Sequence, residues 1–281
     1  MRTLLFALLL AAPALAEPAP PQGVAPGLVV RPLSAVPNAQ AIGARLWVPD
    51  LDAGFIPQGL AVDGARLALA GYVSTDRAQG RGPCRVLWID PARGAVTRRL
   101  DLPPACGHAG GAAALPGGRL LVADTRALFV VGAAGLERAV ALAGGLRGSF
   151  ADFDGRDVWI GAYDKAGGTL WRLPLAALDK DAIDARDALE TRVAPAEIQG
   201  LAFDRAGSMW ASVSNGRAGA LLRLDAAGAV TARYAAPAGI EDIAFAPDGT
   251  LWASSEAGTR RWSDWPTFFP LVFSIDVTAL R

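Results

Sequence analysis

The chain is poor in histidine, cysteine and lysine, and each scarcity excludes a class of function. His108 is the only histidine among 281 residues, which excludes metal centres built from several histidines. Two cysteines, Cys84 and Cys106, do not make a cysteine-rich zinc site without more histidines. Basic and acidic residues number 27 each, and this balance does not indicate nucleic-acid binding. Lysine occurs only at Lys165 and Lys180, an arginine bias typical of GC-rich bacterial genomes.

Several catalytic motifs are also missing from the sequence. It contains no G-x-S-x-G elbow, no H-E-x-x-H helix, no P-loop, no dinucleotide fingerprint and no WD40 signature. After the first 16 residues no stretch of 18 is apolar, so we expect no membrane insertion.

The first 16 residues are typical of a secretory signal peptide. Arg2 precedes an apolar run, and Ala14-Leu15-Ala16 forms an A-x-A cleavage site. Residues 17–27 form a proline-rich leader, which we expect to be flexible or extended, and 28–281 form one domain. We therefore expect a periplasmic or secreted protein, and in such an oxidising compartment a disulfide between Cys84 and Cys106.

A strand–turn–strand pattern occurs five times, at a spacing of about 40 to 50 residues, which is the length of a four-stranded propeller blade. Small apolar residues fill the first strand of each copy. A third strand follows in all five copies, and a fourth, more polar strand in three of them. The pattern predicts an all-β protein, a β-propeller of five blades. The copies span Gly59–Tyr72, Gly111–Asp124, Phe150–Tyr163, Gly200–Ser214 and Asp242–Ser255.

The last repeat ends at Arg281 without a fourth strand. Residues 28–50 have strand character but no hairpin pattern, so we expect one of their strands to close blade 5 and remove the open edge. The alternative is a sixth, degenerate blade formed by residues 28–50. In blade 3 the insertion Ala176–Thr191 predicts a short surface helix, capped by Asp179 or Asp181.

A ligand site is expected on one face of the ring, where the entries to the first strands meet the loops after the second strands. Gln58, Gln199 and Glu241 occupy the same repeat position and should lie near the axis. Two long loops, Val73–Cys84 and Ala257–Pro270, belong to neighbouring blades and should stand side by side. The polar residues predicted for this face are Gln58, Tyr72, His108, Asp124, Tyr163, Gln199, Asn215, Glu241, Glu256, Arg261 and Trp262.

The roles of these residues have alternatives. His108 is a candidate general base, but it can equally hold its loop through a main-chain hydrogen bond. The oxygen-rich set Asp124, Asn215 and Glu241 suits Ca²⁺, although charged side chains around a water-filled channel are also common without metal. Trp159, Trp210 and Trp252 sit at repeat positions and should pack between blades, whereas Trp262 and Trp265 lie outside the pattern.

The phrases Gln199–Asp225 and Glu241–Gly258 resemble blade openings of the SMP-30/gluconolactonase-like and NHL-like secreted propellers. That resemblance implies a metal-dependent hydrolase in which Glu241 and Asn215 match metal ligands. The sequence departs from the gluconolactonase-like pattern in two ways. Gln58 replaces the opening glutamate in blade 1, and the gluconolactonase-like enzymes resemble six-bladed rings whereas five repeats are counted here.

Three functions follow as expectations. The first is a monomeric propeller that binds a small molecule or peptide on a floor of Gln58, His108, Gln199 and Glu241. The second is a Ca²⁺-dependent lactonase or esterase, in which Glu241, Asn215 and Asp124 hold the ion and His108 moves a proton. The third is a protein-interaction scaffold that uses the loop residues Arg260, Arg261, Trp262 and Trp265.

Overall fold

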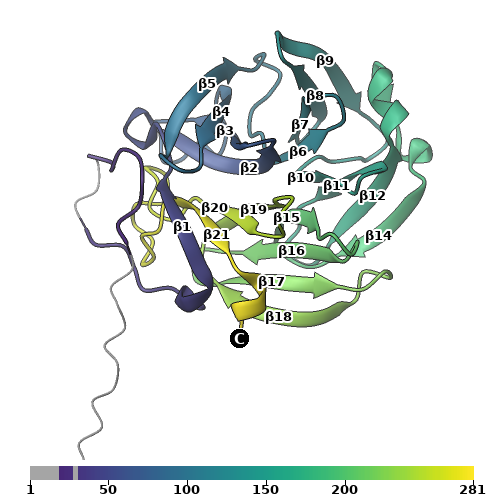
Figure 1. Cartoon of the computed structure of the whole chain (residues 1–281). Coiled ribbons are helices and arrows are strands. Elements are labelled where there is room, and N and C mark those ends of the chain that lie inside the picture. Colours follow the sequence, from purple (N-terminus) through teal and green to yellow (C-terminus); the bar gives the residue numbers. More distant parts are fainter. Residues whose placement is uncertain (1–18, 28–30) are drawn as a thin grey trace, which may run out of the picture.

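Five small antiparallel sheets stand in a ring around a central axis (Figure 1), as a computed structural model shows. The structure describes residues 19–27 and 31–281, so the predicted signal peptide lies outside the described residues. The five-bladed propeller predicted from the repeats is confirmed, and residues 31–50 do not form a blade of their own.

Each blade runs from an inner strand at the axis to an outer strand at the rim. Blade 1 comprises β2 (Phe55–Asp63), β3 (Arg66–Val73), β4 (Cys84–Asp90) and β5 (Ala95–Asp101). Blade 2 comprises β6 (Gly111–Leu115), β7 (Arg119–Asp124), β8 (Ala127–Gly132) and β9 (Gly135–Leu142). Blade 3 comprises β10 (Phe150–Phe153), β11 (Asp157–Ala162), β12 (Gly168–Pro174) and β14 (Glu190–Ala194). Blade 4 comprises β15 (Ile198–Phe203), β16 (Met209–Ser214), β17 (Gly219–Leu224) and β18 (Val230–Ala236). Blade 5 comprises β19 (Ile240–Phe245), β20 (Leu251–Ser255), β21 (Leu271–Ile275) and β1 (Ile42–Trp47).

The ring closes through β1, the strand nearest the N-terminus among those described. It pairs antiparallel with β21, placing Arg45 opposite Phe273 and Trp47 opposite Leu271. This confirms the closing strand predicted within 28–50. The main chain of Gln22 in the leader then bridges the free edge of β1. Because N-terminal and C-terminal strands share one sheet, blade 5 completes only when both ends of the domain are in place.

Glycines let the inner strands approach one another at the axis. A Cβ atom on Gly59 of β2 would lie 2.5 Å from the carbonyl carbon of Gly111 in β6. One on Gly111 would lie 2.3 Å from the amide nitrogen of Ala151 in β10. The small residues at the start of each repeat are therefore required by packing around the axis.

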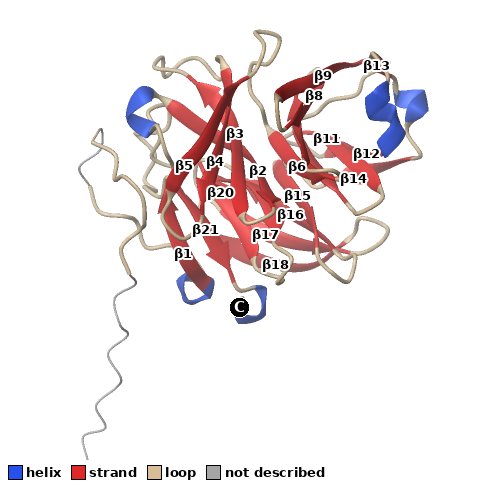
Figure 2. Cartoon of the chain, turned by 45° about the horizontal axis from the view of Figure 1, so that its top comes forward, coloured by secondary structure: helices blue, strands red, loops and turns tan. Residues whose placement is uncertain are grey.

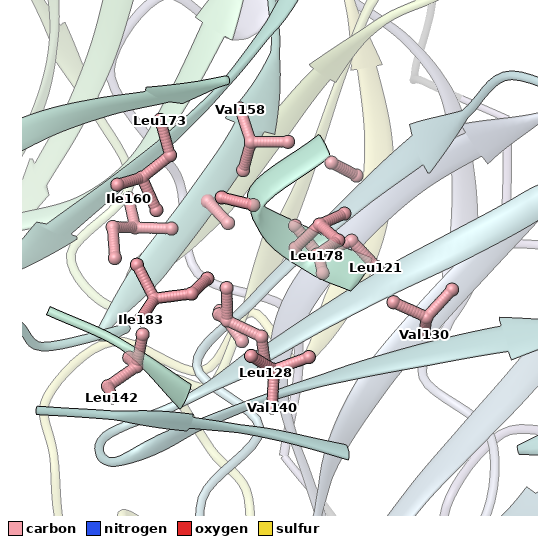
Figure 3. Close-up of a cluster of buried hydrophobic side chains, with 14 of the residues drawn as sticks. Leu121, Leu128, Val130, Val140, Leu142, Val158, Ile160, Leu173, Leu178 and Ile183 are labelled. Atoms are coloured by element: carbon pink, nitrogen blue, oxygen red, sulfur yellow. The ribbon is translucent and has the colours of Figure 1, made fainter. Parts of the chain in front are cut away.

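Apolar side chains fill the spaces between blades. Figure 3 shows the cluster between blades 2 and 3, which also takes Leu178 and Ile183 from the insertion of blade 3. Trp159, Trp210 and Trp252 are buried between blades as predicted. The cluster is built from Leu121, Leu128, Val130, Val140, Leu142, Val158, Ile160 and Leu173, among others.

The helix predicted over Ala176–Thr191 is wrong. The segment forms two 3-10 turns, η3 (Leu175–Asp179) and η4 (Ala185–Asp187), around a short strand, β13 (Ala182–Ile183), that pairs with β9 of blade 2. Leu178 and Ile183 lie five residues apart, so one α-helix could not turn both toward the same core. The other helical turns of the described residues are η1 (Ala39–Ala41), η2 (Leu51–Ala53) and η5 (Val277–Ala279), and Figure 2 shows that the helical turns lie outside the blades.

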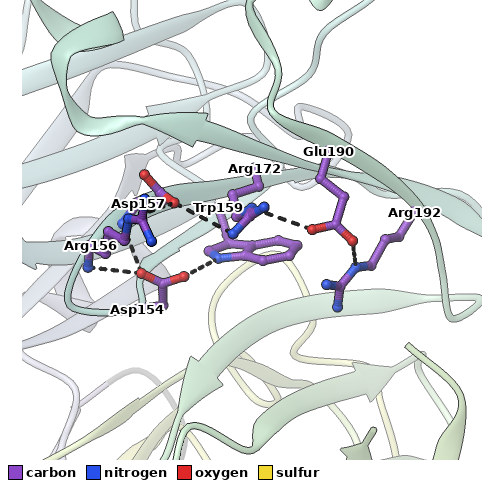
Figure 4. A network of polar contacts seen from close by, with 7 residues as sticks. All are labelled: Asp154, Arg156, Asp157, Trp159, Arg172, Glu190 and Arg192. Atoms are coloured by element: carbon purple, nitrogen blue, oxygen red, sulfur yellow. Dashed lines mark hydrogen bonds and ion pairs between the residues drawn. The ribbon is translucent and has the colours of Figure 1, made fainter. Parts of the chain in front are cut away.

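Turn aspartates anchor tryptophans on the face opposite the predicted site. In blade 3, Asp154 accepts a hydrogen bond from the indole of Trp159 at 2.8 Å (Figure 4). Asp204 does the same for Trp210 in blade 4, at 3.2 Å. In blades 3 and 4 the aspartate after the first strand thus fixes a turn and a core tryptophan together.

Candidate functional site

A cavity of about 630 Å³ opens on the face where a site was predicted. Its size falls in the range of small-molecule sites. First-strand entries and second-strand ends from all around the ring supply its walls. Its lining includes Gln58, His108, Asp124, Ser149, Tyr163, Gln199, Glu241, Glu256, Arg261 and Trp262.

Two glutamates from one hairpin form the floor of this cavity. Glu241 lies in β19 and Glu256 directly follows β20, and their neighbours Ile240 and Ser255 are paired across the hairpin. The two residues are only 2% and 7% exposed. The amide of Gln58 donates to Glu256 Oε2 at 2.9 Å, whereas Glu241 Oε1 is buried without a hydrogen-bond partner.

Burial and mutual repulsion keep a proton on this pair. Burial raises the pKa of Glu241 well above its ordinary value, and the neighbouring Glu256 raises it further. Burial also raises the pKa of Glu256, but the polar groups of Trp262, Glu241 and Gln58 partly offset this. The pKa of Glu241 is the more strongly raised of the two, so a proton shared by the pair favours Glu241, and the floor can supply an acid beside a base.

A third acid, Asp242, serves the fold. Its carboxyl group is fully buried and accepts hydrogen bonds from the amides of Leu60 at 2.9 Å, Ala112 at 3.0 Å and Ile243 at 3.1 Å. These amides belong to β2, β6 and β19, so one side chain joins three inner strands. Asp152 in β10 lies near it, and burial raises the pKa of Asp152 to about 8.

His108 is held by its loop on one wall of the cavity. Its Nδ1 lies 2.9 Å from the carbonyl oxygen of Gly80, and burial lowers the pKa of the imidazole. The neutral ring therefore donates from Nδ1 and keeps Nε2 as an acceptor. Asp124 Oδ1 fixes the loop, accepting from the amides of Gly107, His108 and Ala109 at 3.1, 2.6 and 3.0 Å.

The predicted disulfide between Cys84 and Cys106 is confirmed, with Cα atoms 5.7 Å apart. It ties the start of β4 to the loop that carries His108, and it is typical of proteins in oxidising compartments. Its sulfurs and the Asp124 carboxylate form the one group of three potential metal ligands found among the described residues. Because both sulfurs are oxidised, this triad lacks the thiolates that a metal would need.

The calcium ligands expected from the sequence are not brought together. Asp124 and Glu241 line the cavity, but Asn215 does not. The Asn215 amide donates to Glu197 at 2.8 Å, and its oxygen accepts from the main chain of residues 217 and 218. One oxygen of Asp124 already accepts hydrogen bonds from three amides. Asp124, Asn215 and Glu241 therefore do not together provide the six to eight oxygen ligands that Ca²⁺ takes.

The two long loops do stand side by side, as predicted. Arg77 and Asp264 form an ion pair between them at 3.0 Å. Arg261 packs on Gly80, stacks over Trp262 at 4.5 Å and donates to the hydroxyl of Tyr72 at 2.9 Å.

Tyr72 was predicted to bind ligand, but it lies behind the wall. It is 1% exposed, it stacks on His108 with ring centroids 5.1 Å apart, and it is not among the residues that line the cavity. Burial raises its pKa to about 12. We therefore expect Tyr72 to support Arg261 and His108 without touching a ligand.

Two arginines at the cavity mouth were missed from the sequence. Arg81 comes from the loop after β3 and Arg126 from the loop after β7. Both are exposed, and neither has an ion-pair partner among the residues the structure describes. Their only signal in the sequence was their place in second-to-third strand loops, a place shared by many other residues.

Searches against known proteins identify the fold and no family. No family model and no curated protein matches the chain. The glutaminyl cyclase of Myxococcus xanthus is similar, with a TM-score of 0.61 and 14% identity over 84% of this chain and 94% of that one. A PQQ-bound aldose sugar dehydrogenase from Streptomyces coelicolor gives 0.46 and 16% over 79% and 80%. A gluconolactonase from Xanthomonas campestris gives 0.46 and 19% over 80% and 83%.

At these identities the likeness extends to the fold alone. The class that fold and cavity define is a five-bladed β-propeller with an acidic axial site. Its structural neighbours include a gluconolactonase, but no match places the chain in the gluconolactonase-like family. Among the described residues no helix is long and apolar enough to cross a membrane.

Proposed function

We propose that the axial cavity binds a small polar molecule or the end of a peptide, and that Glu241 and Glu256 exchange a proton with it. The observation that carries this proposal is the unpartnered Oε1 of Glu241, buried at the floor of an open cavity. An unsatisfied buried carboxyl oxygen is costly, and a ligand that hydrogen-bonds to it recovers that cost.

An acid beside a base suits acyl transfer at an amide, ester or lactone. The Glu256 carboxylate takes a proton from the attacking amine or water, and the glutamate pair returns that proton to the leaving nitrogen or oxygen. The carbon–nitrogen or carbon–oxygen bond to the leaving group breaks as the new bond forms, and the pair ends with the proton count it began with. His108 is positioned on the wall as a second proton acceptor, because its ring is neutral and it is Nδ1, not Nε2, that contacts the carbonyl oxygen of Gly80.

This class includes glutaminyl cyclisation, named for the Myxococcus xanthus neighbour, and lactone or ester hydrolysis, expected from the sequence. Peptides with N-terminal glutamine, lactones and esters are therefore the first substrates to test. We expect Glu241→Gln and Glu256→Gln each to lower kcat/KM by about 10²- to 10⁴-fold. Their melting temperatures should not fall, because an amide replaces a buried acid of the same shape.

Glu137→Gln provides the matched control, since Glu137 lies exposed on β9, away from the cavity. It should keep full activity. Turnover of any of these substrates that survives in both cavity variants would remove the glutamate pair from the mechanism.

Calcium dependence is the alternative expected from the sequence, and metal removal tests it. Because the expected ligands are not brought together, we expect EDTA to leave the melting temperature of the purified protein unchanged. A near-stoichiometric calcium content, with a melting temperature lowered by EDTA and restored by Ca²⁺, would favour a metal-dependent hydrolase instead. The scaffold alternative is less favoured, since Arg261 and Trp262 face the cavity.

A further inference from the structure

The axial cavity has acidic side chains at its floor and basic side chains at its mouth. Its floor comes from the β19–β20 hairpin, where Glu241 and Glu256 are buried. Its mouth is flanked by Arg81 and Arg126, which are exposed and lack ion-pair partners among the described residues. A ligand with one positive and one negative end matches this arrangement of acidic and basic groups.

Charge balance at the floor favours a cation as the deep end. The Glu256 carboxylate already faces one fixed cation, Arg261, whose Nη1 is held by the Tyr72 hydroxyl at 2.9 Å. Burial, Glu256 and Asp242 all raise the pKa of Glu241, and none of the groups that shift it is a cation. An ammonium group placed against Glu241 Oε1 would lower the pKa of Glu241 and displace its proton. The ammonium would then compensate the charge of the resulting carboxylate.

The other groups around Glu241 are compatible with this exchange. The hydroxyls of Tyr163 and Tyr72 stay neutral, since burial raises the pKa of both and nearby acidic groups raise it further. Asp242 is committed to main-chain amides of the inner strands. Gln58 and Gln199 add amide oxygens to the cavity wall, which are acceptors for an ammonium.

We propose that the ligand of this cavity is a zwitterion, an amino acid or a peptide, bound with its ammonium group on Glu241 and Glu256 and its carboxylate toward Arg81 and Arg126. The inference rests on the proposed function, because it names the substrate class of the same site. It excludes neutral sugars and anionic compounds without an amine. Neither supplies the cation that two buried carboxylates need once the proton of Glu241 has left.

Thermal shift with four probe sets tests the class: free amino acids, a dipeptide library, the same library N-acetylated, and the same library C-amidated. We expect free amino acids or free dipeptides to raise the melting temperature. Whichever set gives the larger shift identifies the ligand as an amino acid or as a peptide. N-acetylation should weaken binding at least tenfold, and C-amidation several-fold. Arg81→Ala with Arg126→Ala should abolish the effect of C-amidation, whereas Arg119→Ala, at the start of β7 on the opposite face, should not.

Calorimetry of the strongest hit in phosphate and in Tris at pH 7 supplies a second readout. Replacement of the Glu241 proton by an ammonium releases up to about one proton per site, so the measured enthalpy should depend on the buffer. Glu241→Gln has no proton to release and should lose this dependence. Binding of N-acetylated peptides, sugars or lactones in preference to free amines would overturn the inference while keeping the site. If no class binds, the proposed function fails with it.

Discussion

Replacing Asp242 with alanine should lower the free energy of unfolding by about 3 to 6 kcal/mol. The substitution leaves three buried amides, those of Leu60, Ala112 and Ile243, without their acceptor, and each unsatisfied donor costs about 1 to 3 kcal/mol. For a domain of this size the melting temperature should fall by about 10 °C or more. Thermal unfolding followed by circular dichroism measures it.

Asp248→Ala is the matched control, because Asp248 also accepts a main-chain hydrogen bond, from Thr250 at 2.9 Å, but in an exposed turn. It should cost less than about 1 kcal/mol. Asp242→Asn keeps an acceptor and should fall between the two. Equal losses for Asp242→Ala and Asp248→Ala would show that the inner strands do not depend on this carboxyl group.

The fold was predictable because its signal is local. Each blade carries its own strand–turn–strand pattern, so counting the pattern counts the blades. The closing strand followed from what the last repeat lacks, and β1 supplies it. The insertion in blade 3 was misjudged because Leu178 and Ile183 are drawn into the core of a neighbouring blade, a long-range effect that helix-like spacing does not encode.

The site was predictable in position and less so in its contacts. Equivalent repeat positions lie on one face, which placed Gln58, Gln199 and Glu241 at the cavity. The pairing of Glu241 with Glu256 depends on the register of the β19–β20 hairpin. That register shifts between Ile240 and Ile243, and the sequence contains no pattern that predicts the shift. Asn215 lies at an equivalent strand end, yet a local contact with Glu197 takes its side chain away from the cavity.

Removing the disulfide should weaken both the fold and the site. The cross-link between Cys84 and Cys106 spans 22 residues, and closing a loop of that length stabilises a protein by about 3 kcal/mol. The same disulfide holds the loop whose main-chain amides donate to Asp124. The side chain of His108, which belongs to this loop, lines the cavity. We expect the double variant Cys84→Ser/Cys106→Ser to melt about 5 to 10 °C lower than the wild type.

The comparison with reducing agent separates the cross-link from the substituted side chains. Reduced wild type should melt where the double variant melts, and the variant itself should not respond to reductant. Ligand binding should weaken further in Asp124→Ala, in which the bridge remains but the three loop amides lose their acceptor. If the double variant bound ligand as tightly as wild type, the position of His108 would not matter for binding, and the glutamate pair would have to account for the site alone.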